Sequence, residues 1–163
     1  MHISTLLYGG PGVGKTSLAV SSFWDFMKRE PVPGKNGRLL LIGREENDAL
    51  GVPEENIVRF PLPQNNPIKF AQEFETYLKA LNSPKGQEAG VTDLVIDGFT
   101  ELCYDFTYAY RESNDPRDSF EVYREWQRAF IQFMQLLHPK SINANIIGTA
   151  RVAELRRGNT TAR

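Results

Sequence analysis

The sequence contains few of the residues on which disulfide-linked, membrane-spanning or strongly basic proteins depend. Among its 163 residues there is one cysteine, Cys103, so no internal disulfide can form. Nineteen Lys and Arg residues against 20 Asp and Glu residues leave a formal net charge of −1, which gives no overall attraction to nucleic acid or anionic membranes. No apolar run approaches the roughly 18 residues of a membrane-spanning helix. We therefore expect no membrane association and a reducing, cytoplasmic setting.

The length and composition favour a single folded domain over residues 1–163. Hydrophobic residues make up 40% of the sequence and aromatic residues 11%, which is enough to bury one sizeable core. The first residues have neither a positively charged region nor a long apolar region, so we expect no secretory signal. The apolar run at residues 3–8 leads directly into glycines, as a buried strand entering a turn does.

Short apolar runs alternate with amphipathic segments along the chain, and this alternation predicts the fold class. The runs that have the character of buried strands lie at residues 3–8, 39–43, 56–60, 94–96 and 144–148. Apolar spacing typical of helices occurs at residues 15–29, 66–81 and 120–137. Strands that alternate with helices favour a three-layer α/β domain, in which a mainly parallel sheet has helices on both faces.

Some details of these segments are more specific. One face of the first expected helix is formed by Ala19, Phe23, Phe26 and Met27. Asn66 is the expected N-cap of the second. Residues 83–92 have the polar composition of a loop. The aromatic residues at 104–110 fit both a strand and a helix face, so this segment stays open between the two. Their side chains are expected either in the core or, as the alternative, stacked on bases.

The most specific pattern is G-x-x-x-x-G-K-[ST] at residues 9–16, which we call the glycine loop. It follows an expected strand and opens an expected helix, which is the context that this pattern requires. Glycines allow consecutive backbone N–H groups to surround phosphate oxygens, and the helix N-terminus adds partial positive charge. We expect ATP to be bound by Gly9, Gly10, Pro11, Gly12, Val13, Gly14, Lys15, Thr16 and Ser17.

Three residues are expected to bind the charged groups of the triphosphate and its magnesium ion. Lys15 reaches the β- and γ-phosphates, and the Thr16 hydroxyl is a ligand for Mg²⁺. Asp97 ends the apolar run at residues 94–96, so it projects from the carboxyl edge of the sheet beside the glycine loop. A carboxylate there holds Mg²⁺ directly or through water, which is the Walker B role. The alternative is an aspartate that caps a turn or a helix.

Hydrolysis of a triphosphate also needs a group that positions or activates the attacking water. Glu45 follows the apolar run at residues 39–43, and a glutamate at the end of a neighbouring strand can reach the γ-phosphate. Glu46 and Glu101 compete for this role, and a solvated loop acid is the structural alternative. Lys15 and Glu45 are therefore the first catalytic candidates.

Taken together, the glycine loop, Glu45 and the run ending in Asp97 resemble the core of the RecA-type ATPases. The resemblance is greatest to the compact phage members that act in single-strand annealing and recombination, and it covers nearly the whole chain. The glycine loop is its specific part, and the remainder is order and spacing. It implies a RecA-like sheet and Mg²⁺-dependent ATP hydrolysis coupled to single-stranded DNA. It also implies assembly as a homo-oligomer, with a recombination or single-strand-binding protein as partner.

The same resemblance assigns roles to the last part of the chain. In the family a polar residue at the end of the next strand senses the γ-phosphate, and Thr149 takes that place, where RecA itself has a glutamine. Residues 151–163 correspond to a mobile basic loop or tail with four arginines and one glutamate, a local charge of 4 − 1 = +3. Its candidates for binding DNA are Arg151, Arg156 and Arg157, and a solvated chain end is the alternative.

Two further expectations concern the site and the extent of the domain. Arg151 and Arg156 are candidates for an arginine that a neighbouring subunit contributes to the site. The RecA core continues into further strands after this point, so we expect a C-terminally truncated domain or a minimal variant.

Two other functions fit the same glycine loop. A P-loop nucleoside or nucleotide kinase uses this loop equally well, but it needs an arginine-rich lid, and the sequence shows no such segment between its helices. An ATP-dependent binding switch hydrolyses little and orders its arginine-rich segment when the γ-phosphate is present. An AAA+ motor fits less well, because Gly98 follows Asp97 where that class usually has a second acid.

Overall fold

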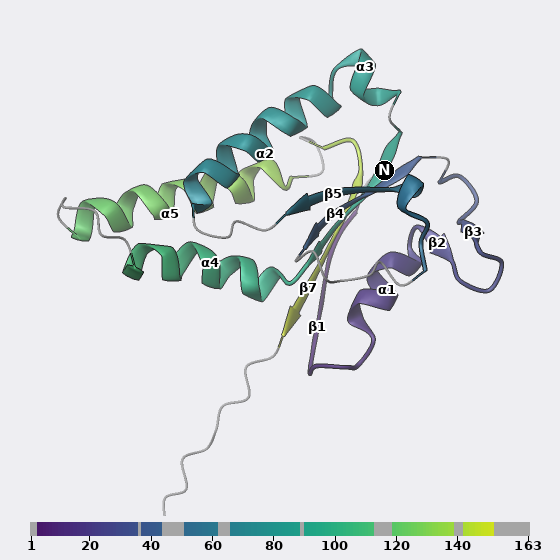
Figure 1. The fold of residues 1–163 in the computed structure, drawn as a ribbon, viewed down its shortest axis with the longest axis horizontal. Helices are drawn as coiled ribbons and strands as arrows, with labels where there is room; N and C mark the ends of the chain where they lie inside the picture. Colours follow the sequence, from purple (N-terminus) through teal and green to yellow (C-terminus); the bar gives the residue numbers. More distant parts are fainter. Residues whose placement is uncertain are drawn as a thin grey trace, which may run out of the picture.

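The computed structural model describes residues 3–35, 37–43, 51–61, 66–88, 90–112, 119–138 and 142–151. Within these ranges five strands form one sheet, in the spatial order β1-β7-β6-β4-β5 (Figure 1). The strands are β1 (Ser4–Gly9), β4 (Arg38–Gly43), β5 (Ile57–Pro61), β6 (Val91–Asp97) and β7 (Asn145–Arg151). Every neighbouring pair is parallel. The predicted α/β class with a mainly parallel sheet is therefore confirmed.

Strands β4, β6 and β7 bury both of their faces over most of their length, which explains their uninterrupted apolar runs. Strand β1 differs, because Leu6 and Tyr8 are 53% and 75% exposed, so the prediction of a buried strand at residues 3–8 is correct for the strand and wrong for its burial. Successive side chains of a strand point to opposite faces, so neighbouring residues enter different cores. Leu40 and Ile42 of β4 lie in a large core on one side of the sheet. Leu39 and Leu41 of the same strand lie in a small core on the other side. All four side chains are buried, and both cores continue across β6 and β7.

The large core lies between the sheet and three helices, α2 (Pro67–Leu81), α4 (Phe99–Glu112) and α5 (Ser119–Leu136), on the left in Figure 1. Aromatic rings from all three helices meet there, with centroid separations between 5.2 and 6.4 Å among Phe70, Phe74, Phe106 and Phe133. Aromatic pairs of this kind stabilise a fold by about 0.5–1.5 kcal/mol each beyond the burial of their area.

Two predictions about these helices have clear outcomes. The Asn66 side chain accepts a 2.9 Å hydrogen bond from the Lys69 backbone N–H, so the predicted N-cap of α2 is confirmed. The segment 104–110, which the sequence left open, is helical within α4, and Phe106 is buried in the large core. The predicted polar loop at 83–92 is wrong in part, because it contains the short helix α3 (Pro84–Gln87) and the start of β6.

The opposite face of the sheet is covered by α1 (Lys15–Ser21) and by the hairpin of β2 (Trp24–Asp25) and β3 (Glu30–Pro31). The predicted helix over residues 15–29 is therefore wrong beyond Ser21. The Asp25 carboxylate accepts hydrogen bonds from the backbone N–H groups of Met27 and Lys28, which closes a turn in place of a further helical turn. Met27, predicted on the buried face, is 94% exposed.

A buried ion pair fixes the amino end of the sheet. Asp93 of β6 is fully buried, and its two carboxylate oxygens accept hydrogen bonds from Lys35 Nζ at 2.8 and 2.7 Å. The Asn145 amide of β7 donates to the same carboxylate at 3.1 Å and accepts from the backbone N–H of Ile3 at 3.2 Å. This network joins the segment before β4 to β6, β7 and the start of β1.

None of the helices in the described ranges has both the length and the apolar character needed to cross a membrane.

Candidate functional site

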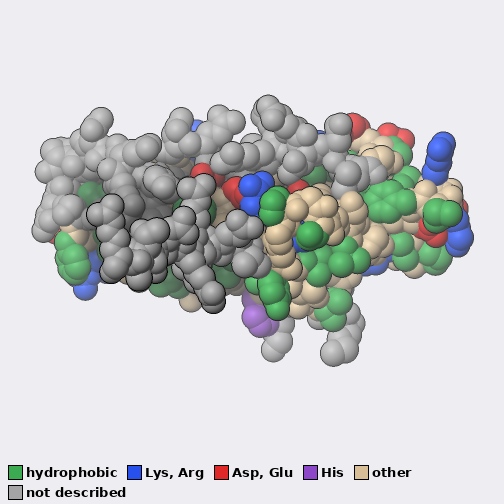
Figure 2. All heavy atoms as spheres, turned by 90° about the horizontal axis from the view of Figure 1, so that it is seen from below, with side chains coloured by type: hydrophobic (Ala, Val, Ile, Leu, Met, Phe, Trp, Pro, Cys, Tyr) green, Lys and Arg blue, Asp and Glu red, His purple; other side chains and the backbone are tan. Residues whose placement is uncertain are grey.

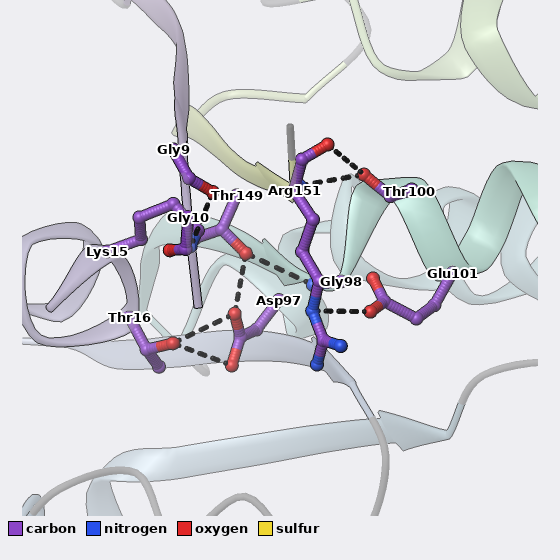
Figure 3. A network of polar contacts seen from close by, with 10 residues as sticks. All are labelled: Gly9, Gly10, Lys15, Thr16, Asp97, Gly98, Thr100, Glu101, Thr149 and Arg151. Carbon is purple, nitrogen blue, oxygen red and sulfur yellow. Dashed lines mark hydrogen bonds and ion pairs between the residues drawn. The ribbon is translucent and has the colours of Figure 1, made fainter. Parts of the chain in front are cut away.

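The predicted site residues meet at the carboxyl edge of the sheet. Parallel strands end at the same edge, and the register places Thr149 of β7 beside Asp97 of β6. In the same way Arg151, the last residue of β7, is paired with Gly9, the last residue of β1. Figure 3 shows these residues around one point, with the start of α1 on one side and the start of α4 on the other.

Thr16, Asp97 and Thr149 form one hydrogen-bonded group. The Thr16 hydroxyl donates to the Asp97 carboxylate, with its oxygen 3.0 Å from Oδ1 and 3.1 Å from Oδ2. The Thr149 hydroxyl donates to Asp97 Oδ1 at 2.6 Å and accepts from the backbone N–H of Gly98 at 3.1 Å. Asp97 is 7% exposed and Thr149 is 2% exposed, so the three groups meet largely away from solvent. The two residues predicted to bind the metal are therefore in direct contact.

The structure gives Thr149 a different contact from the one that the resemblance implied. Its hydroxyl is buried and donates its hydrogen bond to Asp97, so in this arrangement it orients the carboxylate. Direct sensing of a γ-phosphate by Thr149 stays a prediction.

The glycine loop has the open backbone that binding of an anion requires. Gly12 and Gly14 have φ values of 74° and 82°, a left-handed region that side chains with a Cβ rarely adopt. A Cβ placed on either residue, or on Gly10, meets no atom within 4 Å. The loop is thus shaped by its glycines and has free space beside its backbone, which is where phosphate oxygens approach N–H groups.

Lys15 is held across its own loop. Its ammonium donates hydrogen bonds to the carbonyl oxygens of Gly9 at 3.1 Å and Gly10 at 2.7 Å. An ammonium has three N–H groups, so this arrangement leaves one of them for an anionic oxygen. The positive charge of Lys15 therefore lies beside the backbone of the glycine loop.

A second polar group lies where α4 begins, directly after Asp97. Arg151 Nε is 2.9 Å from Glu101 Oε1, and the Arg151 backbone N–H donates to the Thr100 hydroxyl at 2.8 Å. The other Glu101 oxygen, Oε2, is buried without a hydrogen-bond partner among the described residues. It lies against Gly98, where a Cβ would come within 3.1 Å of it. The φ of 101° at Gly98 likewise requires glycine.

Three predicted site residues lie outside the described residues, namely Glu45, Arg156 and Arg157. Glu45 comes two residues after Gly43, the last residue of β4. A Cβ on Gly43 would lie 3.4 Å from the Asp97 carbonyl oxygen, so β4 ends closely packed against Asp97. Arg151 was expected at the start of a mobile segment, but it is the final residue of β7 and is hydrogen-bonded to α4.

The donor set fits one class of metal ion better than others. Among the described residues no three His, Cys, Asp or Glu side chains are grouped to hold a metal. A zinc or calcium site built from protein ligands alone therefore has no support there. Magnesium differs, because it keeps several waters and is typically bound by one or two carboxylates together with substrate phosphates. The hydroxyl of Thr16 and the carboxylate of Asp97 match that requirement.

The sequence did not reveal the contact between Arg151 and Glu101, although both residues were considered separately. They are 50 positions apart (151 − 101), and they meet because β7 ends beside the first turn of α4. One signal in the sequence was available. Thr100 and Glu101 follow Asp97 closely, so a helix that starts there keeps both residues at the carboxyl edge of the sheet.

No model of a known protein family matches this sequence, and comparison with curated proteins likewise finds no match. Function is therefore inferred from the geometry of the site.

Proposed function

We propose that this protein binds ATP with Mg²⁺ at the glycine loop and hydrolyses it. The observation that carries the proposal is the contact between the Thr16 hydroxyl and both Asp97 oxygens, at 3.0 and 3.1 Å. A hydroxyl that follows the loop lysine and a carboxylate that ends a neighbouring strand are the two ligands with which P-loop NTPases hold Mg²⁺. We also propose that the domain with this parallel sheet is a P-loop NTPase of the RecA-like type.

Different residues bind the phosphates and the magnesium ion. The N–H groups of the glycine loop and the Lys15 ammonium bind the β- and γ-phosphates. Thr16 and Asp97 hold the magnesium ion, which neutralises charge on the phosphate oxygens when it is bound. Thr149 fixes the orientation of Asp97 through the 2.6 Å hydrogen bond between them.

Hydrolysis follows by in-line attack of water on the γ-phosphate. The water oxygen forms a bond to the γ-phosphorus while the bond from that phosphorus to the β–γ bridging oxygen breaks. ADP and inorganic phosphate are the products, and the proton of the water passes to a carboxylate. Glu45 is the proposed acceptor of that proton, since it follows the strand that packs against Asp97.

We further propose that hydrolysis is coupled to single-stranded DNA, as the resemblance to phage RecA-like ATPases implies. On the face that Figure 2 draws, the visible Lys and Arg side chains lie in separate groups, among hydrophobic and acidic ones. We assign the proposed DNA contacts first to Arg156 and Arg157, because Arg151 ends β7 and forms an ion pair with Glu101. Arginine side chains on a basic segment suit contacts with phosphates.

The test is Mg²⁺-dependent release of phosphate from ATP, measured with and without single-stranded DNA at low and moderate salt. Lys15→Ala is the blank, and Lys85→Ala is the matched control because Lys85 is an exposed lysine of α3. We expect hydrolysis that requires Lys15 and is stimulated by DNA, with stimulation that fades as salt rises.

Other results would replace the proposal in defined ways. Lys15-dependent hydrolysis at the same rate with and without DNA would exclude the coupling to DNA. The next test would then be transfer of phosphate to other acceptors, as for a kinase. Tight ATP binding with negligible hydrolysis would favour the binding switch. Absence of any Lys15-dependent ATP binding would overturn the proposed function.

A further inference from the structure

Arg151 lies one strand away from the glycine loop. It is paired with Gly9 in the parallel register of β7 with β1, and neighbouring strands are about 4.8 Å apart. The Thr100 hydroxyl accepts a hydrogen bond from the Arg151 backbone N–H, so α4 holds the backbone at this point. The side chain itself is 65% exposed. A backbone fixed next to Gly9, the first residue of the glycine loop, therefore carries an accessible guanidinium.

Glu101 engages this guanidinium in a way that leaves most of its donors free. The closest approach in this ion pair joins Arg151 Nε to Glu101 Oε1, at 2.9 Å. The two terminal nitrogens of Arg151 make no hydrogen bond to the described residues, although a bidentate pair with the carboxylate is the stronger arrangement. In the view of Figure 3 the guanidinium lies between the carboxylates of Asp97 and Glu101.

The Glu101 carboxylate is not fully satisfied by this pair. Its Oε2 is buried against Gly98 and has no hydrogen-bond partner among the described residues. Leaving a buried acceptor without a partner costs about 1–3 kcal/mol, so a contact made only for stability would be expected to use both oxygens. The pair is better explained as one that orients the guanidinium and keeps its terminal N–H groups for a ligand.

We propose that Arg151 binds the terminal phosphate of ATP within its own subunit, and that Glu101 is the positioning residue that directs its guanidinium. The inference rests on the proposed function and adds a specificity determinant to it. ADP lacks the γ-phosphate, so the contact favours the triphosphate over the diphosphate. It also gives Arg151 a role separate from DNA binding and from an arginine supplied by a neighbouring subunit.

The first experiment measures affinity for a non-hydrolysable ATP analogue and for ADP, both with Mg²⁺. Arg151→Ala is expected to weaken binding of the analogue about 10-fold to 100-fold, because one or two charge-assisted hydrogen bonds are lost. Binding of ADP is expected to change by no more than about twofold. Arg151→Lys keeps the charge but not the planar fork, so its loss is expected to be intermediate.

Arg59→Ala is the matched control for Arg151→Ala. Arg59 is also an arginine of a strand that pairs with a glutamate, Glu54, but it belongs to β5 at the opposite edge of the sheet. It is expected to leave both affinities unchanged. Equal losses of the analogue and of ADP in Arg151→Ala, or losses no larger than those of Arg59→Ala, would overturn the inference.

Variants of Glu101 test its positioning role. Glu101→Gln keeps an oxygen that can accept from Arg151 Nε, whereas Glu101→Ala removes it. We expect Glu101→Ala to lower the preference for the analogue over ADP about 3-fold to 10-fold, and Glu101→Gln to restore most of it. In the Arg151→Ala background neither change should alter the preference further, since residues that act as one unit are not additive. An independent effect in that background would contradict the positioning role.

A mixing experiment separates action within one subunit from action between subunits. Lys15→Ala retains Arg151, and Arg151→Ala retains Lys15, so contacts between subunits would restore activity in a mixture of the two. We expect no restoration, and recovery of hydrolysis on mixing would overturn the assignment to the same subunit. Failure of the parent protein to bind ATP through Lys15 would instead reject the proposed function, so the two failures are distinguishable.

Discussion

Thr149 and Asp97 stand in register on neighbouring strands, and the Thr149 hydroxyl donates a 2.6 Å hydrogen bond to Asp97 Oδ1. The same hydroxyl accepts from the Gly98 backbone N–H, so one buried group serves both an acceptor and a donor. A carboxylate that must hold a metal ion is effective only in one orientation, and supporting hydrogen bonds commonly set that orientation.

The first prediction concerns this hydroxyl. Thr149→Val keeps the shape of the side chain but leaves Asp97 Oδ1 and the Gly98 N–H each without this hydrogen bond. We expect a loss of about 1–3 kcal/mol in the free energy of unfolding, measured in urea, and a higher Mg²⁺ concentration for half-maximal ATP binding. Thr149→Ser retains the hydroxyl and should behave much like the parent. If valine and serine gave the same Mg²⁺ requirement, the orienting role would be excluded.

The second prediction addresses the group that activates water. Glu45→Gln removes the proton acceptor while leaving the loop, Lys15 and Asp97 in place. Turnover should fall about 10²-fold to 10⁴-fold, with ATP affinity nearly unchanged, because general base catalysis acts on the chemical step. Glu46→Gln is the matched control, and it should retain turnover. The assignment fails if Glu46→Gln, rather than Glu45→Gln, produces the loss.

The third prediction separates stability from function. Asp93 is fully buried and accepts from Lys35 and Asn145 at the amino end of the sheet, far along β6 from Asp97. Asp93→Ala leaves the Lys35 ammonium without its partner, so we expect a loss of about 3–5 kcal/mol in the free energy of unfolding. Under conditions where the variant is folded, its ATP affinity should match that of the parent. The double change with Lys35→Ala should cost less than the sum of the single changes.

The fourth prediction uses the single cysteine as a probe. Burial raises the pKa of the Cys103 thiol above its ordinary value of 9.0, because the anion is disfavoured away from water. Folding therefore favours the protonated thiol, and this contribution to stability is present below pH 9 and is lost as pH rises through the higher pKa of the folded state. At pH 7.5 a disulfide reagent should react slowly with native protein and rapidly in urea.

The control for this prediction is Cys103→Ser, which should remove part of the loss of stability above pH 9. Tyr77 contributes to the same range, because burial also raises the pKa of its hydroxyl above 10.0. An identical pH profile in the parent and in Cys103→Ser would show that the thiol titrates alike in both states.

Strands β4, β6 and β7 were predictable because both of their faces are buried over most of their length. A run such as residues 39–43 has no polar alternation, and this is the signature of a strand covered on two sides. The order of the strands in the sheet was not predictable from such runs, since periodicity carries no information on which strands pair. The end of α1 was also not predictable from spacing. Phe23 has the spacing of a helix face, but it lies beyond the end of the helix at Ser21 and is buried there all the same.

The site was predictable to a similar extent. A motif with a fixed spacing identified Thr16, and the end of an apolar run identified Asp97, and the structure brings the two side chains together. The contact between Arg151 and Glu101 could not be predicted, because it depends on the angle at which α4 leaves β6. Sequence spacing near a motif indicates its ligands, whereas ion pairs between distant segments depend on the tertiary arrangement.

The position of β1 has a consequence for hydrogen exchange. Within the described part of the chain β1 pairs with β7 alone, so the strand that carries the glycine loop lies at the edge of the sheet. Edge strands open locally at a lower free energy than central ones such as β6, and their amide protons exchange sooner. A ligand held by both the glycine loop and Asp97 would join the edge of the sheet to its centre. Occupancy would then be recorded as slower deuterium uptake along β1, so this edge strand would report binding of the ligand.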